Sequence, residues 1–278
     1  MTVQIIIFGC FEGFHHSITC GVRLNHSKIR AYSLMLVENM TIPVEIRSTF
    51  EEASRIIQET FNQSDIQSGS QVTPDQLIEA VTQFLFVFDK LDLENGENGA
   101  ILFDDVNQLG DHAIGFLMDL AYWADRLRLP KSKMDVEKTA LGVAHWLIRH
   151  EGELRTLEPL VNSLAASANL TQEPATLKAL AQVMGDVLTH AAPSVQADLE
   201  KNDPTRPWRI LNFNYAIVAT RTQDTELMVK AFDVLGRNLP EDCPEFFEQG
   251  LQQAQKAAYA PAVQNILQEH FNRWTTKH

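Results

Sequence analysis

Two cysteines and two adjacent histidines fall within the stretch CFEGFHHSITC, which runs from Cys10 to Cys20. Thiolate and imidazole groups are the ligands that zinc prefers, and a structural zinc site closes around the ion with four ligands. Cys10, His15 and Cys20 are separated by four residues in each interval and could supply three of the four. This stretch is therefore the first place in the chain where a metal could supply chemistry.

The spacing of this stretch resembles the last three ligands of a zinc knuckle, C-x2-C-x4-H-x4-C. Ile7 occupies the place of the first cysteine, and Phe14 stands where a glycine usually precedes the histidine. His16 is adjacent to His15 and is poorly placed to bind the same ion. Because three ligands leave such a site one short, we interpret the cysteines as small buried hydrophobes and expect neither a metal nor a cofactor.

A second set of chemistry-bearing side chains falls on the polar face of a helix predicted over residues 100–128. Its members are Asp104, Asp111, His112 and Asp119. Carboxylates beside a histidine can transfer protons or bind a metal inside a helical bundle. A charged stripe opposite an apolar stripe is also the ordinary pattern of a solvated helix face. An enzyme with its site around His112 is therefore an alternative, and not the leading interpretation.

The pattern along most of the chain predicts helices. In the helix over 100–128, apolar residues recur at steps of four and three. The preceding helix begins at Thr73, with Pro74 at its first position and Gln76 completing a capping box. Its apolar residues cover nearly the whole circumference, which predicts burial on all sides. Further helices are predicted at about 134–150, 154–169, 174–190, 193–201, 207–220, 225–237, 243–257 and 261–275.

The first 61 residues have a different pattern. The segments TVQIIIF and KIRAYSLMLVE are β-branched or alternating, which predicts a small β element in the first 50 residues. Ser48 and Glu51 have the spacing of a capping box and predict a helix that starts there. The polar stretch 62–71 is predicted to be a linker, so that residues 72–278 form an all-α domain that folds without residues 1–61.

Composition and charge exclude several classes of function. The formal net charge of −13 disfavours nucleic acid and anionic membrane surfaces as partners. No apolar stretch approaches the length of a membrane span. Three cysteines in 278 residues do not form a disulfide framework, which fits a reducing compartment. We therefore expect a cytoplasmic protein.

Near the C-terminal end, Trp208, Leu211 and Tyr215 follow the spacing W-x2-L-x3-Y, and Pro240 follows the next predicted helix. This pattern resembles the tetratricopeptide repeat, whose first helix reads W-x2-L-G-x2-Y. Part of the pattern recurs 38 residues later, starting at Phe246, so the resemblance covers about the last seventy residues. Together with the predicted helices, it implies a mostly all-α fold of stacked antiparallel helical hairpins, either α-solenoid-like or an irregular bundle.

The resemblance also implies a function and a surface. The first helix of each such hairpin lines a concave face, which would carry Arg206, Arg209, Phe213 and Phe247. Arginine binds carboxylates through two hydrogen bonds, so the resemblance implies a partner protein that offers an acidic or C-terminal peptide. We expect a non-enzymatic interaction module, such as an adaptor, scaffold or assembly factor. A structural subunit of an obligate complex is a further alternative.

Overall fold

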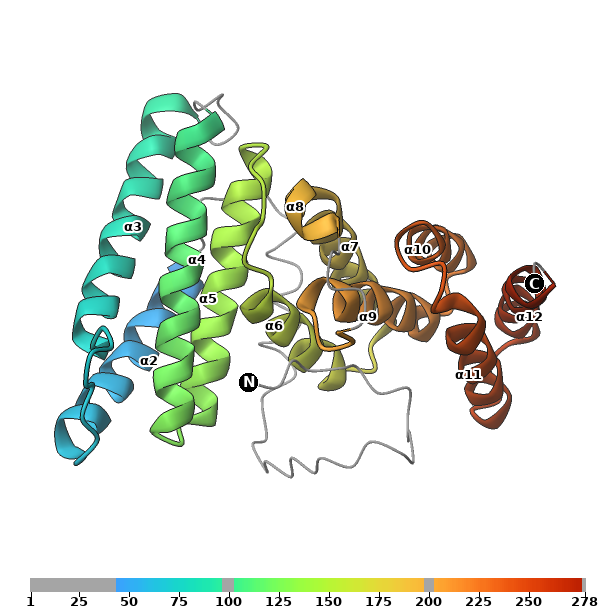
Figure 1. Cartoon of the computed structure of the whole chain (residues 1–278), viewed down its shortest axis with the longest axis horizontal. Helices are drawn as coiled ribbons and strands as arrows, with labels where there is room; N and C mark the ends of the chain where they lie inside the picture. The colour runs from blue at the N-terminus through green and yellow to red at the C-terminus, as the bar shows by residue number, and fades with distance from the viewer. Residues whose placement is uncertain (1–43, 97–102, 198–202, 277–278) are drawn as a thin grey trace. The chain divides into compact units, whose positions relative to one another are not determined.

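The computed structural model describes residues 44–96, 103–197 and 203–276, and in these ranges it consists of eleven helices joined by turns (Figure 1). The helices are α2 (Val44–Gln63), α3 (Pro74–Asn95), α4 (Phe103–Arg126), α5 (Pro130–Arg149), α6 (Glu158–Asn169), α7 (Pro174–His190), α8 (Pro193–Gln196), α9 (Pro207–Thr222), α10 (Thr225–Asn238), α11 (Cys243–Lys256) and α12 (Pro261–Thr275). The described ranges contain no strand, only one isolated bridge between Leu154 and Ala191. The predicted all-α class is confirmed. The predicted β element and the Cys10/His15/Cys20 set lie outside the described residues, except that residues 44–50 are helical.

The chain divides into two compact units. The N-terminal unit contains α2 to α5, the part of α6 up to Leu164, and α8; the C-terminal unit contains α6 from Ala165, α7, and α9 to α12. The polar stretch 62–71 connects α2 to α3 within the N-terminal unit, so the boundary predicted there does not coincide with this division. No helix of the described ranges has the combination of length and apolarity that crossing a membrane requires.

In the N-terminal unit, α2 packs against α5 and α3. Its buried residues Ile46, Phe50, Ala53 and Ile57 follow one another at steps of four, three and four, which places them on a single face. The helix starts at Val44, four residues before the predicted cap. Ser48 therefore lies inside the helix and donates to the carbonyl of Glu45 at 3.0 Å, so the predicted capping box is wrong.

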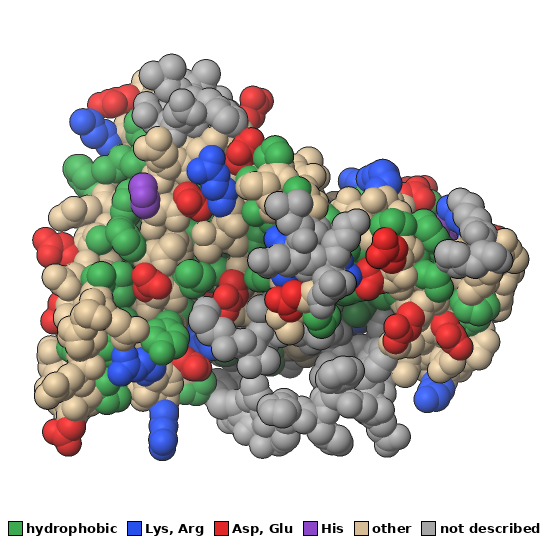
Figure 2. Space-filling model, viewed as in Figure 1, with side chains coloured by type: hydrophobic (Ala, Val, Ile, Leu, Met, Phe, Trp, Pro, Cys, Tyr) green, Lys and Arg blue, Asp and Glu red, His purple; other side chains and the backbone are tan. Residues whose placement is uncertain are grey.

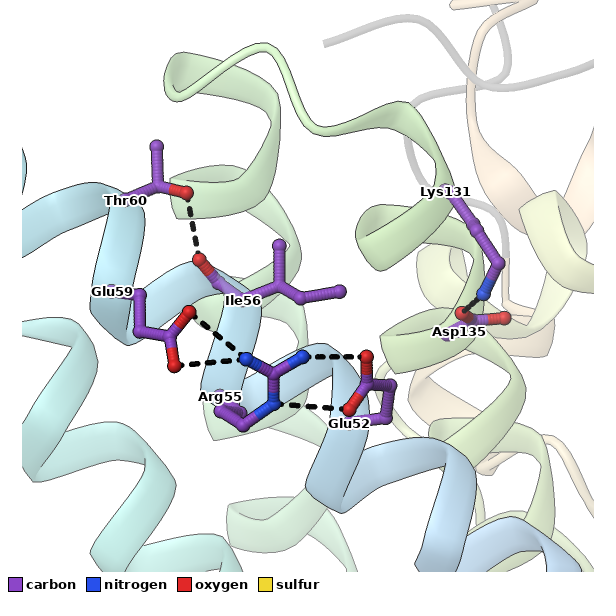
Figure 3. Close-up of polar contacts among 7 residues, drawn as sticks. All are labelled: Glu52, Arg55, Ile56, Glu59, Thr60, Lys131 and Asp135. Atoms are coloured by element: carbon purple, nitrogen blue, oxygen red, sulfur yellow. Dashed lines mark hydrogen bonds and ion pairs between the residues drawn. The ribbon is translucent and has the colours of Figure 1, made fainter.

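The outer face of α2 is tied together by local ion pairs (Figure 3). Arg55 donates to Glu52, one turn before it, and to Glu59, one turn after it, over 2.8 Å contacts. On α5, Lys131 pairs in the same way with Asp135, four residues on. Ion pairs one turn apart on a helix contribute little to stability where water screens them, as it does around Arg55. They support the helices locally and do not decide how the helices pack.

Helices α4 and α5 make the most extensive contact in the unit and lie side by side (Figure 1). Gly110 on α4 allows this close approach, since a Cβ at that position would overlap the side chain of Leu147 on α5. Leu147 is fully buried, as is Trp146 next to it. The chain then leaves α5 and runs through residues 150–157 without helix, and α6 begins at Glu158 instead of near the predicted 154.

In the C-terminal unit, α9 packs with α10 and α11 packs with α12. Asn238 at the end of α10 donates to Asn212 in the second turn of α9 at 2.8 Å, so these two helices are antiparallel. Phe247 near the start of α11 contacts His270 near the end of α12, with ring centroids 5.1 Å apart, so the second pair is antiparallel as well. The predicted succession of helical hairpins is thus present in this unit.

The two hairpins of the C-terminal unit contact each other helix by helix. Phe213 on α9 stacks against Phe246 on α11, and Phe232 on α10 meets His270 on α12 edge to face. Helices α10 and α12 also approach closely at Gly236, where a Cβ would lie 2.7 Å from the indole of Trp274. Helix α9 of the first hairpin therefore lies beside α11 of the second, and α10 lies beside α12.

Candidate functional site

Two of the four residues that the sequence predicted to bind a partner, Arg206 and Phe213, are partly accessible at the α9–α11 surface. The rings of Phe213 and Phe246 lie 5.9 Å apart with an interplanar angle of 24°, and both side chains are half-buried. We call these two residues the aromatic pair. Arg206 is the half-buried N-cap residue of α9, about two helical turns before Phe213. Two rings held against each other offer apolar area that loses little conformational freedom on binding.

Two of the predicted surface residues are not on the surface. Phe247 is 0% exposed and packs between Phe232 and His270. Arg209 is 7% exposed, and its guanidinium binds the carboxylate of Asp242 at 2.7 Å. The expectation that Arg209 and Phe247 lie on an exposed face is therefore wrong, because both are needed to join α9, α11 and α12.

A signal for the correct face was present in the sequence. The buried residues of α11 are Cys243, Phe247, Gly250 and Ala254, at steps of four, three and four. That spacing selects Phe247 as the core residue and leaves Phe246 beside it, one-third of a turn away. The alignment with the repeat pattern instead placed Phe246 in the core, which shifted the predicted surface by one residue.

The motif residues themselves lie in the core of the C-terminal unit. Trp208, Leu211 and Tyr215 are each 3% exposed or less. Asn212 stands where the repeat pattern has a small residue, and it is 1% exposed. It donates to the carbonyl of Trp208 at 2.9 Å and accepts from Asn238, so this buried amide has partners for both of its polar atoms.

The acidic set on α4 does not converge. The side chain of Asp104 lies outside the described residues. Asp111 accepts a hydrogen bond from the hydroxyl of Thr156 at 3.2 Å, while His112 and Asp119 are exposed. Partial desolvation raises the pKa of Asp119. His112 and Asp119 are seven residues apart on one helix, about 10 Å along its axis, which is too far for an acid–base pair. Within the described ranges, no three His, Cys, Asp or Glu side chains lie so that they could hold a metal ion.

A buried polar cluster that sequence reasoning missed surrounds Asp92 on α3, which is 5% exposed. The indole of Trp146 donates to Oδ1 of Asp92 at 2.9 Å, and Nε2 of His150 lies 2.9 Å from the same oxygen. Arg149 reaches the other oxygen at 3.3 Å. Arg149 and the C-cap residue His150 follow Trp146 by three and four residues, so all three lie on one side at the end of α5, which was the available signal. The cluster ties α3 to α5, and this multiplicity of partners marks a structural role for the carboxylate.

A second missed group is Glu137 on α5, which is 4% exposed. Burial raises the pKa of Glu137 to about 7, against the lowering effects of Lys133 and of a hydrogen bond from Asn162. The amide of Asn162 on α6 donates to Oε1 at 3.1 Å. Because the pKa of this carboxyl is raised by folding, the free energy of unfolding of the N-terminal unit depends on pH.

The outer face of α3 differs from the prediction of burial on all sides. The predicted start of this helix is confirmed, since Thr73 and Gln76 form the capping box. Beyond it, Phe86 is 69% exposed and Leu93 is 86% exposed. In Figure 1, α3 lies at the edge of the layer that it forms with α4 and α5, and in Figure 2 hydrophobic side chains reach the surface of this layer. Among the described residues, none covers this apolar face of α3.

No protein-family model matches the chain, and neither the curated proteins nor the solved structures yield a significant match. Function is therefore inferred from the surfaces and clusters described above.

Proposed function

We propose that this chain is a non-enzymatic interaction module that binds another protein at the α9–α11 surface. The observation that supports the proposal is the aromatic pair, in which Phe213 and Phe246 from the first helices of two consecutive hairpins stack at 5.9 Å and stay partly accessible. Aromatic side chains, Phe included, are enriched at protein–protein interfaces relative to the rest of the surface. The likeness to tetratricopeptide repeats points to the same role.

The chemistry of the partner follows from the charges around the pair. Arg206 and Arg209 supply positive charge beside the pair, with the carboxylate of Asp242 bound to Arg209 and that of Asp203 close to Arg206. We therefore propose a peptide segment that packs an apolar or aromatic side chain on the aromatic pair, with an acidic side chain or C-terminal carboxylate directed towards Arg206. The rings supply most of the affinity in this arrangement, and the ion pair at the rim affects the rate of association and its salt dependence.

The enzymatic alternative around His112 gains no support. Asp111 binds the hydroxyl of Thr156, while His112 and Asp119 are exposed, so the described members of this set do not form one site. The remaining alternative, a structural subunit of an obligate complex, shares the requirement for a partner surface. A cytoplasmic location belongs to the proposal and is supported by the thiol of Cys243, which is buried and forms no disulfide.

The experiment is affinity capture from the source cells, followed by titration of the captured partner against purified variants. Phe213→Ala combined with Arg206→Glu is expected to weaken binding by about thirtyfold or more, the effect of losing about 2 kcal/mol at a hot spot. Val229→Ala is the matched control, because Val229 is a 40% exposed apolar residue on α10 of the same unit. Both variants are first checked for an unchanged Tm. Equal affinity of the double variant and the wild type would rule out this surface.

A further inference from the structure

The exposed face of α3 has a specific composition. Phe86 and Leu93 are seven residues apart, so they lie on one stripe about 10 Å from each other along the axis. Between them, Lys90 and Asp89 are also accessible, with side chains 63% and 40% exposed. We call these four residues the α3 stripe. It combines two large apolar groups with one charge of each sign.

Two apolar side chains this exposed on one stripe need an explanation. Single exposed apolar residues are common on protein surfaces, but neighbouring large ones mark interaction sites. The rest of α3 behaves as expected for a packed helix, since its other face buries Leu77, Val81, Leu85 and Phe88. Among the described residues of the N-terminal unit, the α3 stripe is therefore a surface that the packing of the helices leaves uncovered.

We propose that the α3 stripe binds the same stripe of a second copy of this chain, with the two α3 helices antiparallel. With the two-fold axis between Asp89 and Lys90, Phe86 of each copy lies opposite Leu93 of the other. In the same register Lys90 lies opposite Asp89 of the other copy. An interface of this kind is isologous, so each apolar contact and each ion pair occurs twice.

Other arrangements do not satisfy both requirements. A parallel, in-register pair would place Lys90 against Lys90, and like charges in contact are unfavourable. An antiparallel pair centred on Phe86 would place Leu93 against Glu79 and Lys90 against Thr82. Only the register centred between Asp89 and Lys90 matches apolar with apolar and positive with negative.

The charge arrangement within one copy is compatible with this pairing. Asp89 binds Arg47 of α2 through Oδ1, and Lys90 approaches Glu94 at 3.7 Å in an exposed pair. The second pair is long and solvated, so Lys90 loses little by turning to another carboxylate. A contact limited to the four residues of each α3 stripe is smaller than a stable interface, which buries roughly 1,200–2,000 Å². The dimer is therefore weak and depends on protein concentration.

The first test uses the full-length chain in analytical ultracentrifugation over a wide concentration range. The wild type is expected to associate to a dimer, and Lys90→Glu or Phe86→Ser is expected to raise the dissociation constant at least tenfold. Val72→Ser is the matched control, because Val72 is a 49% exposed apolar residue just before α3 and outside the stripe. This surface is in a different unit from the aromatic pair, so the dimer variants are expected to keep binding at α9–α11. The inference and the proposed function can thus fail separately.

The second test fixes the register by disulfide formation. Phe86→Cys and Leu93→Cys proteins, one carrying a mass tag, are oxidised alone and as a mixture, with the wild type as control for the natural cysteines. A mixed disulfide that forms faster in the mixture than either homodimer does alone supports the antiparallel register. Faster homodimer formation by Phe86→Cys alone overturns the register. The proposed dimer is overturned if the wild type stays monomeric at all concentrations. It is also overturned if the α3 stripe binds only a different protein.

Discussion

The guanidinium of Arg209 on α9 and the carboxylate of Asp242 at the start of α11 lie 2.7 Å apart. Asp242 is the N-cap residue of α11, yet its side chain makes no capping hydrogen bond. Asp242 and Glu245 have the types and spacing of a capping box, but no such box forms. The acceptor that would have capped α11 instead neutralises a buried arginine of the neighbouring hairpin.

Removal of this carboxylate is predicted to destabilise the C-terminal unit. Asp242→Asn keeps the size of the side chain but removes the carboxylate that binds Arg209, whose side chain is 9% exposed. We expect a loss of about 1–3 kcal/mol in the free energy of unfolding, measured by urea denaturation. Asp233→Asn is the control, since its pair with Arg273 is 3.9 Å long and about half exposed. That change should stay within about 0.5 kcal/mol. Equal effects of both variants would mean that the Arg209 pair contributes nothing special.

Two glycines of α4 are predicted to respond to alanine in opposite directions. At Gly110 the new methyl group would overlap the buried side chain of Leu147, so Gly110→Ala should destabilise the N-terminal unit by about 1–3 kcal/mol. At Gly115 a Cβ would have nothing within 4 Å, so Gly115→Ala should stabilise the helix by up to about 1 kcal/mol. Thermal and urea unfolding of the two variants compare these signs directly. Similar behaviour at both positions would contradict the close packing of α4 on α5.

Stability of the N-terminal unit is predicted to fall as pH rises through the range set by Glu137. Its pKa is raised in the folded state to about 7, above the value near 4.5 of an unperturbed glutamate. Between these values the folded state binds more protons than the unfolded state, so stability decreases with increasing pH. The full loss above pH 7 is at most about 3 kcal/mol.

The measurement compares wild type with Glu137→Gln in urea at pH 5 and pH 8. Glutamine cannot titrate, so the variant should gain stability relative to the wild type as pH rises. Glu248→Gln on the exposed face of α11 is the control, and its difference from wild type should stay nearly constant. A difference between Glu137→Gln and wild type that does not change with pH would show that this carboxyl does not titrate in the range.

Truncation of Phe50 tests whether α2 belongs to the N-terminal unit. Phe50 is 2% exposed, so Phe50→Ala should lower the stability of the unit by about 3–5 kcal/mol. The sequence-based boundary at 62–71 predicts that residues 72–278 would be unaffected by any change before residue 62. Protection of the amides of α5 in hydrogen exchange separates the two expectations, because α5 is the helix against which α2 packs. Unchanged protection of α5 would favour the boundary at 62–71.

Most helices could be predicted because their signals are local. Thr73 accepts a hydrogen bond from a backbone N–H group in the first turn of α3, as the capping pattern indicated, and Asp224 does the same in α10. The apolar steps of four and three in α4 placed Val106, Ala113 and Leu120 in the core. Capping and periodicity depend on residues within one or two turns, so a single sequence contains them.

The candidate sites were harder to predict, because each depends on a neighbour that is distant in the sequence. Asp242 has the type and spacing of a cap, and only the nearness of Arg209, 33 residues earlier, explains why it does not act as one. Asp92 lies among apolar residues of α3 and has meaning only once Trp146 and His150 of α5 surround it. A charged side chain next to the core is costly without such partners, and periodicity does not identify the partners.

The sequence by itself determined that the described chain is helical, where nearly all of its helices lie, and which residues form the apolar face of most of them. Only the tertiary structure decided that Phe247 is core and Phe246 is partly accessible, that Arg209 is paired, and that Phe86 and Leu93 of α3 remain uncovered. The physical reason is that helix formation and amphipathicity arise from interactions within a few residues. Exposure depends on which other helix packs against each face, and that is settled by contacts between segments far apart in the chain.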